Sequence, residues 1–338
     1  MNSLGIFYDD LALDLGTANT LIYIKGKGVV LDEPSVVAIS ERDSSIRAVG
    51  KEARDMFGKT PDYIKTIRPL QDGSIADYDS TEQMVSSFMK QVIKKKAFLK
   101  PRLLICVHSA ITQYERRVIR EIAQHCKARK VYFLPEPMAA AIGAKIPVQE
   151  ATAHMIVDIG GGTTEVAVIA SSEIAHWEAI KIAGDEMDEA IQQHIRQKCN
   201  LVISLLEAER IKKEIGSAIS LPEKLETTVR GKDMVTDLPK SVTIDNELIR
   251  AGLKRPLKAI AELIIRALEH IPAALAADIQ QDSIMLAGGG SLLRGLDTYL
   301  SQETGRTFIV AEDPLRAVVN GSGMVLENPL IFANVCLN

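Results

Sequence analysis

Two short segments of the sequence place an aspartate and a glycine between two runs of strand-forming residues: LDLGTANTLIYI at 13–24 and VDIGGGTTEVAVIA at 157–170. The residues that the segments share at the same spacing are Asp14, Gly16 and Thr20 in the first and Asp158, Gly160 and Thr164 in the second. A strand that ends in Asp-x-Gly, followed by a returning strand, predicts a tight hairpin whose backbone N–H groups can converge on an anion. Glycine permits this close approach because it has no Cβ atom.

The duplication of this turn suggests a chemistry for it. Two such turns on facing lobes could hold a polyphosphate from both sides, and their carboxylates could hold water ligands of Mg²⁺, an ion that keeps much of its hydration shell. A single turn of this kind is more often an ordinary glycine hairpin, so the second copy is what favours ATP binding. The sequence contains no G-x-x-x-x-G-K-[ST] segment, which excludes a Walker-type phosphate loop.

Two further segments could contact the rest of a nucleotide. LAGGGSLLRGL at 286–296 follows a strand-like run and is expected to open an amphipathic helix, whose N-terminus would add positive potential beside a purine and ribose. A plain strand–turn–helix connection is an equally good interpretation of these glycines. LLEAERIKKEIGSA at 205–218 predicts a charged helix that ends at Gly216, and its simplest interpretation is a solvated face with i,i+4 ion pairs.

The elements that must position these motifs alternate along the chain, which predicts an α/β fold. Strand-like runs are LALDL, TLIYI, SVVAI, RLLICV, HMIVDI, EVAVIA and SIMLA, and helical periodicity is clear in 82–96 and 118–126. Both halves begin with strand, Asp-x-Gly turn and strand, so we expect two related lobes. The predicted domains are 1–147 together with 314–338, with an inserted subdomain at about 32–76, and 148–313, with an inserted subdomain at about 184–249.

Composition limits the class of protein. The chain has 338 residues, 46% of them hydrophobic, which is enough for two domains with a cleft between them. Its formal net charge is −4, with Lys and Arg scattered, so no nucleic-acid partner is expected. The four cysteines lie far apart, which indicates a reducing cytosol and no zinc site. MNSLGIFYDD does not resemble a secretory signal, and no segment approaches the ~20 apolar residues of a spanning helix.

Taken in order, several motifs resemble those of the actin-like ATPase superfamily and, within it, the MreB family of bacterial actins. They are LDLGTANT, LPEPMAAAIGA, VDIGGGTTEVAV, GDEMDEAI, AERIKKEIGSA and LAGGGSLLRGL, supported by GKGVVLDEPSVVAI and IVAEDPLRAVVNGSG. The resemblance covers essentially the whole chain. It implies an actin-like fold of two ribonuclease H-like lobes, each with a smaller inserted subdomain, around a nucleotide cleft.

The resemblance also implies roles for single residues. Asp14 and Asp158 would lie near a hydrated Mg²⁺, and the catalytic group would consist of Glu136, Thr163 and Asp158. The residues that would contact phosphates are Thr17, Ala18, Asn19, Gly160, Gly161 and Gly162. The residues that would approach the ribose and base are Glu209, Arg210, Ile211, Lys212, Gly288, Gly289, Gly290 and Ser291.

Glu136 opens a helix of small residues, PMAAAIGA, that is thin enough to pack between lobes. A carboxylate at this N-terminus can hold a water in line with a γ-phosphate. Without the resemblance, a simple N-terminal helix charge is the better interpretation. Pro135 stands where the family usually has a second glutamate, and His108 and Ala110 stand where Pro and Gly are usual. His108 is expected to be a packed loop histidine rather than a catalyst.

The function implied by the resemblance is that of a filament-forming ATPase with a scaffolding role. It would bind ATP and Mg²⁺, assemble into paired antiparallel filaments and hydrolyse ATP slowly in the polymer. Its partners would be itself, the inner face of the cytoplasmic membrane and the shape-determining membrane proteins that organise peptidoglycan synthesis in rod-shaped cells. An actin-fold small-molecule kinase would need an aspartate base facing an acceptor, and a chaperone-type ATPase would need a further domain after NGSGM at 320–324.

A membrane contact is expected at KKKAFLKPR, 94–102, where Phe98 and Leu99 lie beside lysines and before Pro101. The resemblance implies that an apolar loop at this position inserts into the bilayer when the N-terminus has no amphipathic helix. The alternative is that both side chains fold back as a hydrophobic lid.

Overall fold

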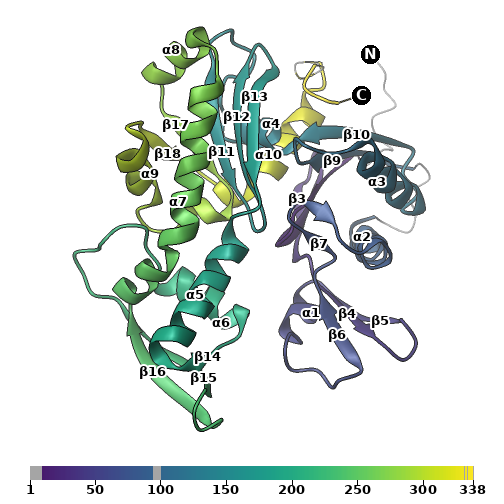
Figure 1. Ribbon diagram of the computed structural model, residues 1–338. Coiled ribbons are helices and arrows are strands. Elements are labelled where there is room, and N and C mark those ends of the chain that lie inside the picture. The colour runs from purple at the N-terminus through teal and green to yellow at the C-terminus, as the bar shows by residue number, and fades with distance from the viewer. Residues whose placement is uncertain (1–9, 94–99, 331, 333, 338) are drawn as a thin grey trace. The chain divides into compact units, whose positions relative to one another are not determined.

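The structure is a computed structural model that describes residues 10–93, 100–330, 332 and 334–337. The chain divides into two compact units (Figure 1). The first unit consists of Met1–Ala151, Ile169–Ala175 and Leu315–Asn338, and the second of Thr152–Val168 and His176–Pro314. Each unit contains a five-stranded sheet, a smaller three-stranded sheet and several helices, so the expected α/β class is confirmed.

The large sheet of the first unit has the strand order β10-β9-β1-β2-β3. Its strands are β1 Leu11–Leu15, β2 Asn19–Ile24, β3 Gly28–Pro34, β9 Arg102–Val107 and β10 Lys130–Pro135. β1, β2 and β3 form an antiparallel meander, and β9 and β10 continue the sheet in parallel with β1. The core side chains of β1 and β9 pack with those of helix α2 (Tyr78–Val92) and helix α3 (Gln113–His125).

The large sheet of the second unit repeats this topology as β13-β12-β11-β17-β18. Its strands are β11 His154–Ile159, β12 Thr164–Ala170, β13 Glu173–Ile180, β17 Ile284–Ala287 and β18 Phe308–Val310. Again the first three strands in sequence are neighbours, and two later strands continue the sheet in parallel with the first of them. The duplication that the two Asp-Gly segments predicted therefore extends to the order of the strands.

The smaller sheets lie in the segments that the sequence marks as inserts. In the first unit the order is β5-β4-β6, with β4 Val37–Ser40, β5 Ile46–Val49, β6 Ile64–Ile67 and the short helix α1 Lys51–Asp55. A two-stranded ribbon follows, β7 Leu70–Gln71 with β8 Ser74–Ile75. In the second unit the order is β14-β15-β16, with strands Leu201–Val202, Glu226–Asp233 and Pro239–Asp245.

The remaining helices follow local sequence signals. Their bounds are α4 Glu136–Gly143, α5 Gly184–Cys199, α6 Leu205–Ile215, α7 Asn246–His270, α8 Ala273–Gln281, α9 Leu296–Thr304 and α10 Ala317–Glu327. α2 begins at Tyr78, earlier than the periodicity at 82–96 indicates. The start is set by Asp77, which caps the helix by accepting a 2.7 Å hydrogen bond from the Ser80 N–H. α6 ends at Gly216 as expected. None of the described helices has the length and apolarity needed to cross a membrane.

Candidate functional site

The first Asp-Gly turn joins β1 to β2 in the predicted hairpin, with Leu15 paired to Thr20. A Cβ atom at Gly16 would lie 2.7 Å from the carbonyl oxygen of Asn19, so a side chain does not fit there without movement of the backbone. The turn is fixed from behind by Ser35. Its hydroxyl donates to the Gly16 carbonyl at 2.7 Å and lies 2.9 Å from the Thr20 hydroxyl.

The second turn, between β11 and β12, repeats the close backbone approach. The Gly160 N–H donates to the Thr163 carbonyl at 2.9 Å, and a Cβ atom at Gly160 would lie 3.3 Å from that oxygen. In place of a serine hydroxyl, the first turn of α5 supports the loop. The N–H groups of Gly184 and Asp185 donate to the carbonyls of Gly160 and Gly161 at 3.2 and 2.8 Å. Both loops therefore bring a glycine close to a carbonyl three residues later, and they have different supports.

The two aspartates differ in exposure. Asp14 is half-buried, whereas Asp158 is only 8% exposed. Burial raises the pKa of Asp158 to about 7, because a desolvated carboxylate favours its neutral form. A nearby cation would return this carboxyl to its charged form. The donor type and the buried position thus fit a hydrated Mg²⁺ held beside the second turn.

The third glycine cluster lies directly against the second turn. A Cβ atom at Gly288 would lie 2.4 Å from Asp158 Oδ1, and one at Gly290 would lie 2.3 Å from the side chain of Ile159. Gly288 also has φ of +78°, which L side chains rarely adopt. The backbone of LAGGG therefore passes along the end of β11, and the tertiary structure brings the second and third motifs together.

The expectation that this cluster opens an amphipathic helix is wrong. A short 3-10 turn, Gly289–Leu292, comes first, and α9 begins only at Leu296 after Gly295 in the left-handed conformation. The reason is the close contact with β11, which forces Gly288 into a positive φ and turns the chain away from a helical path. The potential of an α-helix N-terminus is therefore not available at these glycines.

Lys212 contacts the first turn of α5, the helix turn that supports the second loop. Its ammonium group donates to the Gly184 carbonyl at 2.6 Å and forms an ion pair with Asp188 Oδ1 at 2.9 Å. Both side chains are nearly buried, with Lys212 13% and Asp188 8% exposed. Burial raises the pKa of Asp188 to about 6, and the charge of Lys212 opposes that shift.

Sequence reasoning assigned no role to Gly184 or Asp188, although both lie in the quoted segment GDEMDEAI. The sequence contains only a weak signal for the role of Asp188. An acidic residue in the first turns of a helix has an ordinary explanation in the helix dipole, and nothing local shows that a lysine from another helix pairs with it. The contact depends on how α5 and α6 pack.

The other predicted residues of α6 have different surroundings. Glu209 forms an i,i+4 ion pair with Lys213 at 2.5 Å, and Arg210 is held by Glu207 at 2.7 Å and by Glu214. Ile211 is completely buried in the core. One face of α6 is therefore the solvated, ion-paired face that the sequence predicts, and Lys212 points away from it toward the second turn.

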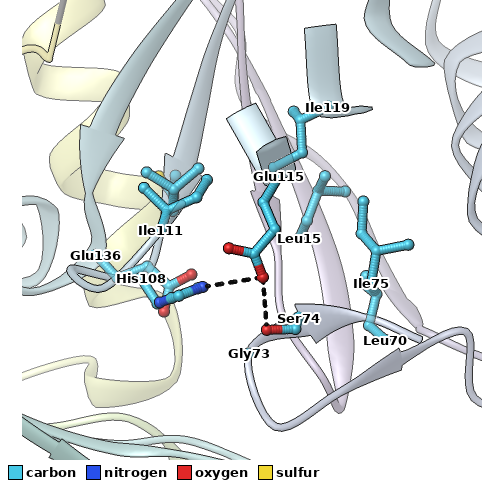
Figure 2. A pocket seen from close by; sticks show the side chains of 12 residues that line it. Leu15, Leu70, Gly73, Ser74, Ile75, His108, Ile111, Glu115, Ile119 and Glu136 are labelled. Atoms are coloured by element: carbon cyan, nitrogen blue, oxygen red, sulfur yellow. Dashed lines mark hydrogen bonds and ion pairs between the residues drawn. The ribbon is translucent and has the colours of Figure 1, made fainter. Parts of the chain in front are cut away.

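Glu136 begins α4 directly after β10, with Pro135 as the N-cap residue. It lines a pocket of the first unit together with His108, Cys106 and Glu115 (Figure 2). α4 packs closely on α10 of the same unit, since a Cβ atom at Gly321 would lie 1.9 Å from the Ala139 carbonyl. The small residues of PMAAAIGA thus serve a helix–helix contact within the unit.

His108 is a packed residue of this pocket, with a side chain 15% exposed and Nε2 4.0 Å from Glu115 Oε1. Glu115 also accepts a 3.0 Å hydrogen bond from Ser74 and completes a capping box with Thr112 (Figure 2). Although burial opposes it, the hydrogen bonds from Thr112 and Ser74 lower the pKa of Glu115. Figure 2 shows Glu115 reaching between His108 and Ser74, with Glu136 beside His108.

Known proteins that are similar to this chain identify its family. The family model described as MreB/Mbl protein matches residues 8–332. The chain belongs to the MreB/Mbl family. It is 49% identical over 329 residues to the cell shape-determining protein MreB of Escherichia coli strain K12, covering 96% of this chain and 94% of that protein.

Solved structures agree with this membership. MreB5 of Spiroplasma citri bound to AMPPNP is 35% identical, with a TM-score of 0.92 over 97% of this chain and 98% of that chain. A structure of the same protein bound to ADP gives a TM-score of 0.91. The MamK double helical filament, at 22% identity, shares the fold with a TM-score of 0.79 over 94% of this chain and 99% of that chain. The expected actin-like fold is confirmed.

The membrane residues expected for this MreB/Mbl family member, Phe98 and Leu99, lie outside the described residues. In the sequence they lie between the end of α2 and the start of β9. Its membrane contact stays a prediction.

Proposed function

We propose that this protein is an ATP-dependent, filament-forming cytoskeletal protein that determines cell shape and hydrolyses ATP slowly in the polymer. The observation that carries the proposal is the duplicated Asp-Gly turn, in a chain similar over nearly its whole length to MreB5 bound to AMPPNP. The name of the Escherichia coli relative supports the role in cell shape. The MamK filament supports assembly, because it shows that a chain of this fold can polymerise.

The proposal assigns the polyphosphate to both turns, the first in the predicted domain of 1–147 and 314–338 and the second in 148–313. Asp14 and Asp158 would hold Mg²⁺ through water, and the ion would compensate the negative charge of the phosphates. The loop backbones that contact phosphate are those of Thr17, Ala18, Asn19, Gly160, Gly161 and Gly162. The groups near the ribose and base are Glu209, Arg210, Ile211, Lys212, Gly288, Gly289, Gly290 and Ser291.

For hydrolysis, Glu136 orients the attacking water and Thr163 assists it from the second turn. The position of Glu136 at the start of α4 supports this role, since its carboxylate is anchored by a rigid helix and lines a pocket. A water-orienting group acts mainly in the transition state. Its removal should therefore lower kcat much more than nucleotide affinity.

The decisive experiment is electron microscopy of the purified protein with ATP and Mg²⁺, paired with a phosphate-release assay. Paired filaments or sheets, with phosphate released slowly after assembly, are expected. Glu136→Gln should assemble and release phosphate at least about tenfold more slowly. A protein that forms no polymer and phosphorylates a small molecule would instead be an actin-fold kinase, and nucleotide-controlled peptide binding would indicate a chaperone-type ATPase.

We also propose that filaments bind the inner face of the cytoplasmic membrane through Phe98 and Leu99 and there organise peptidoglycan synthesis with shape-determining membrane proteins. Burial of one Phe and one Leu contributes at most about 3–6 kcal/mol. Each nearby lysine adds ~1 kcal/mol at an anionic surface. A monomer should bind weakly and a filament strongly, because the loop repeats at every subunit.

Co-sedimentation with anionic liposomes in the presence of ATP tests this contact. Phe98→Ser/Leu99→Ser should polymerise as the parent does and lose most of its liposome binding. A double variant that polymerises and still pellets with liposomes like the parent would exclude this loop as the anchor and leave the N-terminus as the alternative.

A further inference from the structure

A second cluster of ionisable side chains lies in the second unit and includes no residue of the two glycine turns. His176 and Glu178 come from β13, and Arg266 and His270 come from the last turns of α7. Residues i and i+2 of a strand lie on one face, as do residues i and i+4 of a helix. The segments HWE and RALEH therefore bring two imidazoles, a carboxylate and a guanidinium together where α7 ends beside an edge strand.

Both histidines are directed at the same carboxylate oxygen. His270 Nδ1 lies 2.6 Å and His176 Nε2 lies 3.3 Å from Glu178 Oε1. The two rings are 6.1 Å apart and meet edge-on, at 68° between their planes. Of the residues that the structure describes, these three are the group of His, Cys, Asp or Glu whose ligand atoms all lie within 4.8 Å of one another.

Two neutral imidazole nitrogens and one carboxylate oxygen form a donor set that suits Zn²⁺. In a tetrahedral site with bonds of about 2.0–2.1 Å, neighbouring ligand atoms lie about 3.3 Å apart. The distance from His176 to Oε1 already has this value. His270 lies closer to Oε1 than this, so it would move outward by roughly 0.7 Å on the same geometry, and its side chain has room to do so because it is 57% exposed.

Arg266 determines which carboxylate oxygen faces the histidines. Its Nε donates to Glu178 Oε2 at 2.7 Å, so that Oε1 is left toward the two imidazoles. A contact of this kind fixes the orientation of a ligating carboxylate, as outer-sphere partners do in metal sites. The guanidinium charge also weakens attraction for a cation, which argues for modest rather than tight binding.

We propose that His176, Glu178 and His270 form a binding site for a divalent transition metal of the zinc class, which ties the edge strand β13 to the end of α7. The site uses three protein ligands and leaves a fourth position for water or a group from another molecule. It contains no cysteine, which is why the cysteine spacing gave no sign of it. The proposal of this site does not rest on the proposed function.

The chain carries its own reporter for this site, because its single tryptophan is Trp177, between two of the ligands. The side chain of Trp177 is 42% exposed. Untagged protein, freed of metal with a chelator and without nucleotide or Mg²⁺, is titrated with Ni²⁺ while tryptophan emission is recorded. We expect saturable quenching by one equivalent of Ni²⁺, and displacement of Ni²⁺ by Zn²⁺ should restore the emission.

His270→Gln and His176→Gln should each weaken Ni²⁺ and Zn²⁺ binding at least tenfold. The matched control is His125→Gln, because His125 is 58% exposed and its Nδ1 lies 2.9 Å from Glu82, in a pair without a second histidine. That variant should bind metal like the parent. Circular dichroism of each metal-free variant shows whether it is folded, and His270 is exposed enough that its replacement should not disturb folding.

Thermal unfolding gives a second readout. Zn²⁺ should raise the melting temperature of the parent and of His125→Gln, and leave that of His270→Gln unchanged, since a ligand stabilises only the state that binds it. Quenching that survives in both His176→Gln and His270→Gln, or the absence of any saturable response to Ni²⁺ and Zn²⁺ up to millimolar concentration, would overturn the proposal and leave these residues as an ion-paired network.

Discussion

In the turn after Asp14 a serine hydroxyl holds the loop carbonyl, whereas in the turn after Asp158 two backbone N–H groups of a helix hold it. The first turn has a half-buried aspartate and only neutral groups in these contacts. The second has a buried aspartate, and a lysine contacts the same helix turn that supports the loop. One hairpin sequence thus recurs with two different electrostatic environments.

This difference shows which properties a duplicated motif keeps. The hairpin and its glycine are kept because they are local, and they depend on the close approach of Gly16 to Asn19 and of Gly160 to Thr163. The charge around the loop is not kept, since it depends on helices that arrive from elsewhere in the chain. The second turn should therefore respond more strongly to changes of charge and pH, and the first to changes of size.

The largest expected effect follows from removing the cation behind the second turn. Lys212→Met should destabilise the protein by about 3–5 kcal/mol, because it leaves Asp188 buried without its ion-pair partner. The comparison variant Ser35→Ala, which removes the hydroxyl behind the first turn, should cost about 1–2 kcal/mol. Urea unfolding measures both.

Lys212→Met/Asp188→Leu should recover most of the loss, since two apolar side chains replace the pair. The loss in Lys212→Met should also shrink toward pH 5, where Asp188 takes up a proton. If Lys212→Met were no more destabilising than Ser35→Ala, the charged support of the second turn would be unimportant for stability.

The next effect concerns the pH dependence of the nucleotide-free protein. The folded-state pKa of Asp158 is about 7, above its value in the unfolded chain. The folded state therefore binds the proton more tightly, and stability falls as the pH rises from about 4 through 7. Asp158→Asn should remove this loss and be more stable than the parent at pH 8, by up to about 4 kcal/mol, with little difference near pH 4.

Thermal unfolding at both pH values, without Mg²⁺ or nucleotide, measures this difference. Asp14→Asn is the control, and it should change less with pH because Asp14 is half-buried. An equal pH-dependent gain in both variants would mean that the two aspartates experience the same desolvation.

When the glycines are replaced by alanine, the first turn should be affected more than the second. Gly16→Ala places a Cβ atom 2.7 Å from the Asn19 carbonyl and should cost about 1–3 kcal/mol. Gly160→Ala places it 3.3 Å from the Thr163 carbonyl, where a shift of a few tenths of an ångström relieves the contact, and should cost less than about 1 kcal/mol. Urea unfolding of the two variants in parallel tests this, and a larger cost for Gly160→Ala would show that the second turn is the tighter one.

The last expected effect tests what the two turns have in common. If both hold Mg²⁺ and phosphate as proposed, Asp14→Asn and Asp158→Asn should each weaken Mg²⁺-dependent ATP binding about tenfold, which corresponds to about 1.4 kcal/mol. Isothermal titration with and without Mg²⁺ measures this. Unchanged affinity in both variants would contradict a site held from two sides.

The sequence by itself determined the elements that are specified locally. The short apolar runs LALDL and HMIVDI form β1 and β11, and each Asp-Gly segment forms a turn between two strands, because an apolar run and a glycine without Cβ specify such structure within a few residues. The repeat of the segment also predicted two related lobes, and the structure shows that the strand order repeats as well. The ion-paired face of α6 was predictable for the same reason, since i,i+4 partners lie on one helix.

Only the tertiary structure decided the properties that depend on burial and on partners distant in sequence. It directed Lys212 away from the solvated face to Asp188, and it raised the pKa of Asp158 by surrounding it. It also places Gly288 in close contact with Asp158, and a 3-10 turn follows where an α-helix was expected. These outcomes arise because desolvation and side-chain pairing depend on how whole helices pack. The periodicity of a short segment does not specify that packing.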